Sequence, residues 1–436
     1  MLACLVLAVV ACYGNAISGD FQFDDYNVIV FNQGVHSWES WMHGLGSGIR
    51  PLLKLSYTLN WTTGTGTAGF HLFNIAVHLC NVLLVFALTR HFLRLHPALP
   101  QEPGFGIPFV VALLFAVHPI HTEAVTYICG RSVALMTLFY LAGLLAYAAG
   151  RARHNRMLVY LGTPLCFVAA LAVKETAVTF PLALLVWQLA SGGTVRDALR
   201  YQWPNWVVLL AAGLLFLVND SYFSQMETSA SLNTLAGNLA TQATGFAYLM
   251  RQWTFPLWLN IDPDLKVVQH LEGQVPQLAF VVGVIALVVA TFRSRPWVSF
   301  ALAWALIQLL PLYIFFPRLD VANDRELYLV SWPLALALVA EMALRLKSGR
   351  LSTAGIMLAC ALGALTVLRN QDYRNEIALW EQTAALSPAK ARVHNNLGFA
   401  YELAGRRAAA RQEYVVALRL NPDYGKARNN LARVAE

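Results

Sequence analysis

The chain has 436 residues, of which 57% are hydrophobic and only 13% are charged, and its mean hydropathy is +0.51. Soluble domains carry roughly 25% charged residues, so this composition excludes an ordinary soluble enzyme and indicates a polytopic helical membrane protein. Basic cytoplasmic loops then explain the net charge of +7 better than nucleic-acid binding does. The six cysteines lie mostly inside apolar segments, a pattern that argues against a disulfide framework or a zinc site.

Eleven apolar segments are predicted to cross the membrane, and apolar stretches long enough for a hydrocarbon core of about 30 Å recur through most of the chain. The predicted spans are 1–18, 69–91, 106–125, 131–150, 157–174, 176–190, 205–220, 277–292, 297–315, 326–346 and 351–368. The basic short connections all fall on one side if segment 239–259 does not cross, and the positive-inside rule makes that side cytoplasmic. Arg251 and Pro256 favour a re-entrant or interfacial helix there. The N-terminus is then cytoplasmic, and the C-terminus lies outside.

An acidic pair, Asp24 and Asp25, follows the first span in the outer loop 19–68. Two interpretations are open from this position alone. The pair is either a solvated loop end or an acid/base or metal-binding centre that serves a membrane-embedded substrate.

A second stretch of the same loop places cationic and aromatic side chains on one helical face. Arg50, Lys54, Tyr57 and Trp61 share that face at helical spacing. Ordinary snorkelling at the membrane surface explains the pattern, and so does binding of a lipid phosphate, which arginine holds in a bidentate way.

Further charged or imidazole side chains stand at other outer span ends. They are His118, His121, Glu123, Arg131, Lys174, Glu175 and Arg325. A His-x-x-His pair alone is a weak metal signal, and helix-end packing or hydrogen bonding explains it better. Because several such clusters converge on one membrane face, we expect a cavity open to the outer leaflet.

The tail from 374 to 436 repeats itself at a spacing of 34 residues. Trp380 recurs as Tyr414, and Asn395-Asn396-Leu397 recurs as Asn429-Asn430-Leu431. This period is typical of tetratricopeptide repeats, with a generic helical hairpin as the alternative. Such repeats present a groove to peptides or partner helices.

Taken together, these motifs resemble the GT-C membrane glycosyltransferases. More narrowly, the chain is similar to the TMTC-like, protein-O-mannosyltransferase-like family with C-terminal tetratricopeptide repeats, as a bacterial homologue. The motifs are Phe23-Asp24-Asp25, Arg50-Pro51-Leu52, Gly69-Phe70-His71-Leu72-Phe73-Asn74, His118-Pro119-Ile120-His121-Thr122-Glu123, Gly130-Arg131, Lys174-Glu175 and Asp324-Arg325-Glu326-Leu327-Tyr328-Leu329. Ser132-Val133 and Val330 depart from the family pattern.

The resemblance implies an inverting transfer of a mannose-like sugar from a polyprenyl-phosphate donor, undecaprenyl or dolichyl, to an acceptor hydroxyl. The acceptor is expected to be Ser or Thr of a protein on the non-cytoplasmic face. Asp24 becomes the general base, and Asp25 orients it or binds the acceptor. The donor phosphate is assigned to Arg50, Lys54 and Arg131. The secondary cavity groups are Tyr57, His71, His118, His121, Glu123, Lys174, Glu175 and Arg325.

The expected architecture is all-α, with a GT-C-like bundle of about eleven spans in residues 1–369 and a tetratricopeptide module in 370–436. A divalent metal stays an open alternative, with the two carboxylates, the two histidines and Glu123 as its ligands. The expected partners are membrane lipid and a protein or peptide acceptor in the repeat groove, with no nucleic acid. We expect a bacterial inner membrane with a periplasmic site, or alternatively the endoplasmic reticulum with a lumenal one.

Two other functions compete with glycosyl transfer. A transporter or flippase for a lipid-linked sugar would share the outer cavity, although such proteins often show inverted repeats and broken helices near mid-bilayer. A non-catalytic scaffold would use only the tail to recruit partners.

Overall fold

The computed structural model describes residues 1–46, 49–101, 105–218, 234–268, 271, 273–310 and 320–435. Within these residues every regular element is a helix. The predicted span 297–315 and the span 205–220 each extend partly beyond the described residues. The all-helical prediction is confirmed for the part of the chain that the structure describes.

Four helices are long and apolar enough to cross a membrane, or five if a bent pair is one span. The four are built on α4 (Gly66–Arg94), α7 (Arg131–Ala152), α16 (Leu327–Ala343) and α17 (Ser348–Asp372). Shorter apolar helices accompany them: α1 (Leu2–Tyr13), α8 (Thr163–Val173), α9 (Phe180–Ala190), α13 (Val275–Thr291) and α14 (Pro296–Leu309). These apolar helices indicate a multi-pass membrane protein.

The bent pair consists of α5 (Ile107–Val117) and a second segment made of η5 (Pro119–His121) and α6 (Thr122–Val125). The axes of the two segments differ in direction by 50°. The bend has a local cause. His118 precedes Pro119, and its ψ of 126° is extended, as expected because the proline ring disfavours the helical conformation of the residue before it.

Two further helices complete the bundle: α10 (Val195–Val218) and α12 (Leu235–Thr254). Although α12 is 20 residues long, it is not among the helices apolar enough to cross a membrane. The same holds for α10, which carries the predicted span 205–220, so this result does not test whether segment 239–259 crosses.

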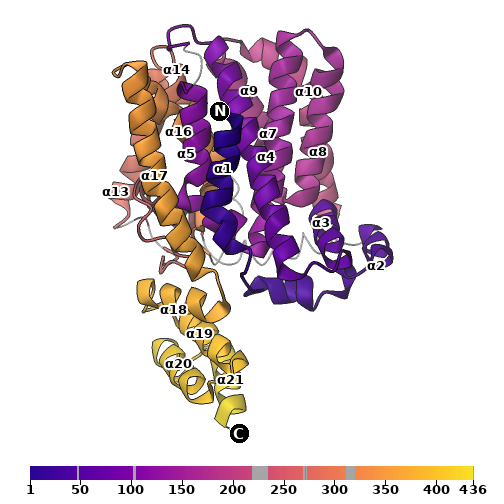
Figure 1. Cartoon of the computed structure of the whole chain (residues 1–436), viewed down its shortest axis with the longest axis vertical. Coiled ribbons are helices and arrows are strands. Elements are labelled where there is room, and N and C mark those ends of the chain that lie inside the picture. The colour runs from indigo at the N-terminus through magenta and orange to yellow at the C-terminus, as the bar shows by residue number, and fades with distance from the viewer. Residues whose placement is uncertain are drawn as a thin grey trace.

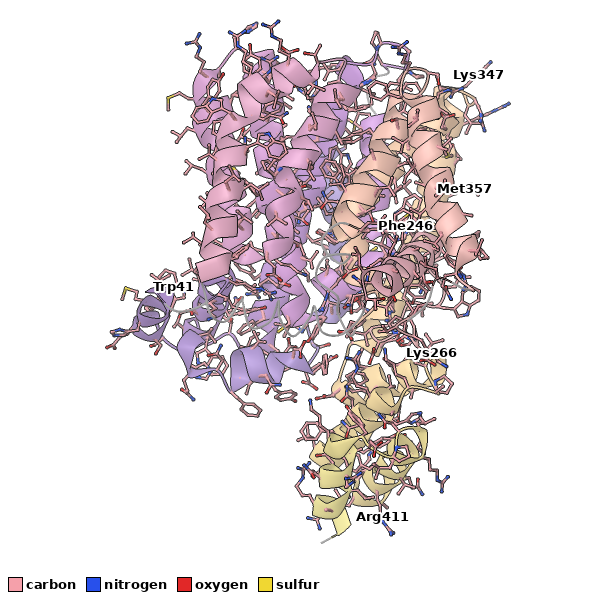
Figure 2. The ribbon with its side chains drawn as sticks, turned by 180° about the vertical axis from the view of Figure 1, so that it is seen from behind. Trp41, Phe246, Lys266, Lys347, Met357 and Arg411 are labelled. Carbon is pink, nitrogen blue, oxygen red and sulfur yellow. The ribbon has the colours of Figure 1, made fainter. Side chains whose placement is uncertain are left out.

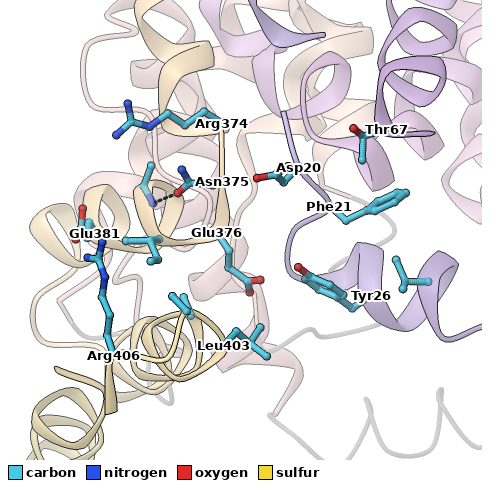
Figure 3. A pocket seen from close by; sticks show the side chains of 15 residues that line it. Asp20, Phe21, Tyr26, Thr67, Arg374, Asn375, Glu376, Glu381, Leu403 and Arg406 are labelled. Carbon is cyan, nitrogen blue, oxygen red and sulfur yellow. Dashed lines mark hydrogen bonds between the residues drawn. The ribbon is translucent and has the colours of Figure 1, made fainter. Parts of the chain in front are cut away.

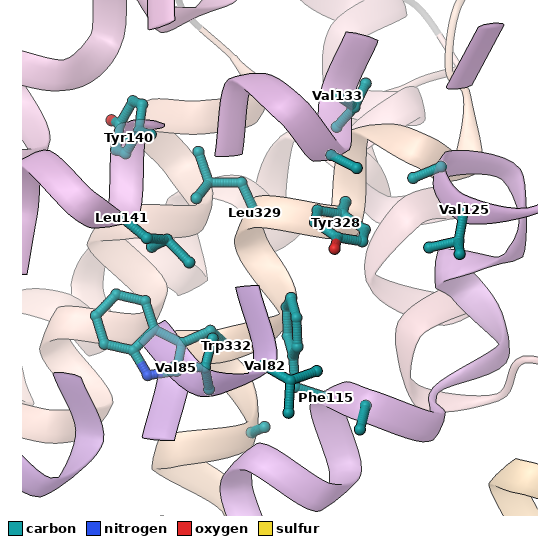
Figure 4. Close-up of a cluster of buried hydrophobic side chains, with 14 of the residues drawn as sticks. Val82, Val85, Phe115, Val125, Val133, Tyr140, Leu141, Tyr328, Leu329 and Trp332 are labelled. Carbon is teal, nitrogen blue, oxygen red and sulfur yellow. The ribbon is translucent and has the colours of Figure 1, made fainter. Parts of the chain in front are cut away.

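The bundle core is aromatic and lies where α4, α5, α7, α9, α14 and α16 meet. Phe115, Tyr328 and Trp332 lie together with valines of α4 in this core (Figure 4). The Trp304 and Trp332 rings meet edge to face at 5.6 Å, and both are fully buried. Such pairs add about 0.5–1.5 kcal/mol beyond area burial, so the core fixes how α14 and α16 pack.

Four consecutive helices form the C-terminal part: α18 (Glu376–Leu386), α19 (Ala391–Leu403), α20 (Arg407–Leu420) and α21 (Gly425–Ala435). Each packs on the next. Gly398 permits the close approach of α19 to α20, because a Cβ there would lie 2.7 Å from the Tyr414 ring. Asn430 donates to Asn395 at 3.0 Å, so asparagines from the two halves of the 34-residue repeat bond to each other.

The C-terminal helices lie at the same end of the bundle as α2 (Trp38–His43) and α3 (Pro51–Thr62) of the first loop (Figure 1). From behind, Trp41, Lys266 and Arg411 lie toward that end, and Lys347 lies at the opposite end (Figure 2). The first loop and the tail therefore share one end of the molecule, which we call the head.

Candidate functional site

The two adjacent carboxylates at the head have different surroundings. Asp25 is fully buried, and its oxygens accept backbone N–H bonds from Gln22 at 2.9 Å and from Cys129 at 2.8 Å. Asp24 is partly exposed, and its own N–H donates to the Tyr127 hydroxyl at 3.1 Å. No described residue hydrogen-bonds to the Asp24 carboxylate or forms an ion pair with it. The Asp25 carboxyl thus stabilises the loop through its two backbone hydrogen bonds, whereas the Asp24 carboxylate is available to a substrate.

Burial raises the pKa of both carboxyls. The pKa of Asp25 rises to about 7, although its bonds from Cys129 and Gln22 oppose the rise. Burial also raises the pKa of Asp24. The positive charge of Arg325 opposes this rise, the negative charge of Asp320 adds to it, and the positive charge of Arg392 opposes it. A carboxylate with a raised pKa is a stronger base once it is ionised, which suits proton abstraction.

Arg325 is the cation that influences Asp24 most strongly, and it stands on the turn η9 (Asp324–Glu326). Its N–H donates to a Glu123 carboxylate oxygen at 3.0 Å, and its Nε lies 3.5 Å from the other oxygen. Glu123 is only 2% exposed, while the Arg325 side chain is 23% exposed. Glu123 therefore orients an arginine that still reaches the surface beside Asp24.

Arg50 forms a bidentate ion pair rather than standing alone. Its Nε and Nη2 donate to the Glu175 carboxylate at 2.9 and 2.6 Å. Arg50 adopts a left-handed conformation with φ of 55° just before Pro51, and Glu175 opens η8 (Glu175–Thr179) after Lys174, which caps α8. The pair ties the first loop to the break between α8 and α9.

Arg131 lies in the interior, where protein groups surround it completely. Its guanidinium donates to Asn74 Oδ1 at 2.6 Å, to the Ser56 carbonyl at 3.0 Å and to the Phe70 carbonyl at 3.0 Å. The Tyr57, Phe70 and Phe73 rings pack around it at 4.3–5.2 Å from their centroids. This geometry makes Arg131 a junction of α3, α4 and α7, and leaves it no surface for a phosphate.

The remaining predicted residues occupy two kinds of position. Tyr57 and the three histidines are buried, whereas Lys54 is half-buried and its side chain makes no hydrogen bond or ion pair with a described residue. His118 accepts from Ile120 N–H at 3.2 Å, so its Nε2 donates to the Trp253 carbonyl at 3.1 Å. His121 contacts the Phe115 carbonyl at 2.8 Å, and His71 contacts the Gly19 carbonyl at 3.2 Å.

These imidazoles hold backbone at the bend and the loop, and they do not converge on Asp24. Among the described residues there is no group of three or more His, Cys, Asp and Glu side chains that could hold a metal ion. The ligand set considered from the sequence is therefore not brought together.

A cavity of about 610 Å³ lies between the first loop and the C-terminal helices, and its lining residues flank the acidic pair in sequence but do not include Asp24 or Asp25. Phe21 and Tyr26 form one wall, and Glu376, Leu403 and Arg406 approach from the opposite side (Figure 3). Phe23, next to Asp24, packs edge to face on Trp380 of α18 at 5.1 Å. The loop that carries Asp24 thus contacts the tail directly.

Several residues of this region were not predicted from the sequence: Tyr127, Asp262, Asp320 and Arg392. Each contributes through contacts between segments far apart in the chain, such as Arg392 with Asp262, 130 residues away. The charged Asn323-Asp324-Arg325-Glu326 motif was the one local signal that pointed to this part of the site.

Comparison with known proteins places the whole chain beside one group of relatives. It is 25% identical to Protein O-mannosyl-transferase F38B6.6 of Caenorhabditis elegans, over 97% of this chain and 63% of that protein. It is also 25% identical to Protein O-mannosyl-transferase Tmtc3 of Drosophila melanogaster (99% and 57%), and 27% identical to human Protein O-mannosyl-transferase TMTC4 (93% and 64%). No family model matches the chain, and no solved structure matches it.

Homologues over nearly the whole chain are therefore TMTC proteins, as the sequence motifs predicted. The chain spans about 57–64% of the length of these relatives.

Proposed function

We propose, from this TMTC-like homology and from the geometry of the head, that the chain is an inverting GT-C glycosyltransferase. It would move a sugar, mannose by analogy with its relatives, from a polyprenyl-phosphate donor to a Ser or Thr hydroxyl of a protein. The observation that carries the proposal is the Asp24 carboxylate, which pairs with no described residue, together with the nearby charge of the partly exposed Arg325.

Asp24 has the properties required of the base. In an inverting transfer, a carboxylate removes the acceptor hydroxyl proton while that oxygen attacks C1 of the sugar, and the bond from C1 to the lipid phosphate breaks. The carboxylate must be accessible and free of competing hydrogen bonds, as Asp24 is. Asp25, with both oxygens used by backbone N–H groups, is better suited to hold the loop in position.

The leaving lipid phosphate needs a cation in position before the reaction. Arg325 fits this role, because Glu123 orients it and its side chain still reaches the surface. A guanidinium stabilises the charge that develops on a leaving phosphate. We therefore move the phosphate role from Arg131 to Arg325, and keep Lys54 and the Arg50–Glu175 pair as groups at the membrane surface.

The membrane path follows from the same proposal. We propose eleven spans with a cytoplasmic N-terminus, which would put the first loop, η9 and the tail on the non-cytoplasmic face, at the head. The four C-terminal helices, with their 34-residue period and the Asn395–Asn430 bond, are proposed as tetratricopeptide repeats that bring a protein acceptor to the cavity between the first loop and the tail.

A transfer assay with the purified protein tests the function. We expect radiolabelled mannose to pass from polyprenyl-phosphate mannose to a Ser/Thr-rich protein, with a linkage whose anomeric configuration is opposite to that of the donor. Glu39 is an exposed carboxylate of α2 in the same loop. Glu39→Gln therefore serves as the matched control for Asp24→Asn, and it should transfer at the wild-type rate. Retained configuration, or donor binding with no transfer to any hydroxyl acceptor, would contradict the proposal.

A further inference from the structure

Polar contacts join the C-terminal helices to a short segment of the bundle, residues 259–262. Asn260 donates to the Ser387 hydroxyl at 2.7 Å, and that hydroxyl donates to the Asp262 carbonyl at 3.0 Å. Gln382 of α18 donates to the Leu259 carbonyl at 3.2 Å. Segment 259–262 is therefore held by the tail, although it precedes the tail by more than 100 residues.

The Asp262 carboxylate is the centre of this attachment. It is buried and accepts from Arg392 Nε at 2.8 Å and from Lys390 Nζ, both near the start of α19. Arg392 also bonds to Asp320, which precedes η9. A buried carboxylate needs such paired cations, so the start of α19 determines where segment 259–262 lies.

From Asp262 the hydrogen bonds continue to the turn that carries Arg325. Asn260 Oδ1 accepts from Asp262 N–H at 3.1 Å, and Asn260 N–H donates to the buried Asp324 carboxylate at 2.9 Å. The next residue, Arg325, donates its N–H to Glu123 at 3.0 Å. An unbroken path of hydrogen bonds and one peptide link thus runs from α19 to Arg325.

Arg392 also acts on Asp24 through space. Burial raises the pKa of Asp24, and the charges that modify this rise are Arg325 and Arg392, which lower it, and Asp320, which raises it. Asp25 and the Tyr127 hydroxyl complete the polar surroundings of Asp24. The cation that anchors segment 259–262 therefore also belongs to the electrostatic environment of the base.

We propose that Arg392 is a positioning residue of the Asp24 centre, which anchors segment 259–262 on α19 and so fixes the turn that presents Arg325. The inference rests on the proposed function. It makes the C-terminal helices part of the active geometry in addition to any role in holding an acceptor, so a displacement of α19 would reach Arg325.

The test uses the full chain in detergent micelles and three variants. Arg392→Gln removes the charge, Arg392→Lys keeps the charge without the bidentate fork, and Arg433→Gln is the matched control. Arg433 of α21 makes a bidentate pair with Glu402, near the end of α19, at 2.6 and 2.9 Å, so its removal breaks a tail ion pair that does not touch segment 259–262.

Amide hydrogen exchange tests the hydrogen-bonded path from α19 to Arg325, and this measurement does not depend on catalytic activity. We expect Arg392→Gln to speed exchange of the Asn260 and Arg325 amides by about tenfold or more, because their acceptors lose a fixed position. Arg433→Gln should leave both amides unchanged. Unchanged exchange in a folded Arg392→Gln protein would overturn the inference.

The kinetics of sugar transfer measure how the loss of the Arg392 contacts affects the site. Arg392→Gln should lower kcat by roughly 10- to 100-fold, as for a small displacement of a reacting group, with little change in the acceptor KM. The acidic limb of the pH–rate profile should move to higher pH, and Arg392→Lys should restore part of both effects. A raised acceptor KM with unchanged kcat would instead make Arg392 a substrate-docking residue. If the wild type transfers nothing, the proposed function fails, whereas the exchange result still decides whether the path exists.

Discussion

Two arginines show how the same side chain serves different purposes in two regions of this protein. Arg131 lies deep among α3, α4 and α7, where three protein acceptors and three aromatic rings occupy its guanidinium. Arg325 stands at the head, with one carboxylate behind it and a side chain that is 23% exposed in front. From the sequence, Arg131 was assigned to the donor phosphate and Arg325 to the secondary groups of the cavity. The difference teaches that a fully satisfied buried cation supports the fold, while a half-satisfied one at a surface is available for chemistry.

Replacement of Arg131 should produce the largest loss of stability. Arg131→Met leaves Asn74 Oδ1 buried without its donor, which costs about 1–3 kcal/mol, and it also removes the charged hydrogen bonds to the Ser56 and Phe70 carbonyls, worth about 1.5–3 kcal/mol each. We expect a loss of roughly 3–5 kcal/mol in the free energy of unfolding, measured in detergent micelles. Arg153→Met, an exposed arginine beyond the end of α7, is the control. Normal stability for Arg131→Met would remove the contrast between the two arginines.

Replacement of Arg325 should reverse that pattern, with a large kinetic effect and a small effect on stability. Arg325→Gln should lower kcat by roughly 10²–10³-fold, or about 2.7–4 kcal/mol, since one pre-positioned charge donor is lost. The melting temperature should stay near that of the wild type. The rate per folded molecule is the quantity to measure. If that rate is unchanged while the protein melts earlier, Arg325 is structural, like Arg131.

The smallest effect is expected from the buried carboxylate. The pKa of Asp25 is raised from 3.8 to about 7 in the folded chain, so the folded state binds more protons than the unfolded state between these values. The free energy of unfolding should therefore fall as the pH rises from about 4 to about 7. Asp25→Asn should flatten this fall and cost about 1–3 kcal/mol at low pH, because an amide cannot accept both backbone N–H bonds well. Equal pH slopes in wild type and variant would contradict the assignment.

The sequence predicted the helical class, the family resemblance and the acidic pair, because these depend on composition, period and adjacent residues. The resemblance assigned the base to Asp24, but the residues alone did not show that Asp25 is the carboxylate that meets the Cys129 and Gln22 amides, since one position along the loop decides this. The sequence assigned Arg131 to the donor phosphate. A sequence shows that an arginine stands at the end of a span, but it does not show which acceptors the guanidinium meets in the fold. Arg392 gave no signal, because its partner Asp262 lies in another segment.

The rate of transfer by Asp24→Asn and Asp25→Asn, measured per folded molecule with polyprenyl-phosphate mannose and a Ser/Thr-rich acceptor, tests the central claim most directly. General-base removal typically costs 10²- to 10⁴-fold. The account predicts a loss of that size for Asp24→Asn in a protein that is otherwise folded, and a smaller loss for Asp25→Asn. Full transfer by Asp24→Asn, or a greater loss for Asp25→Asn at equal folding, would contradict it.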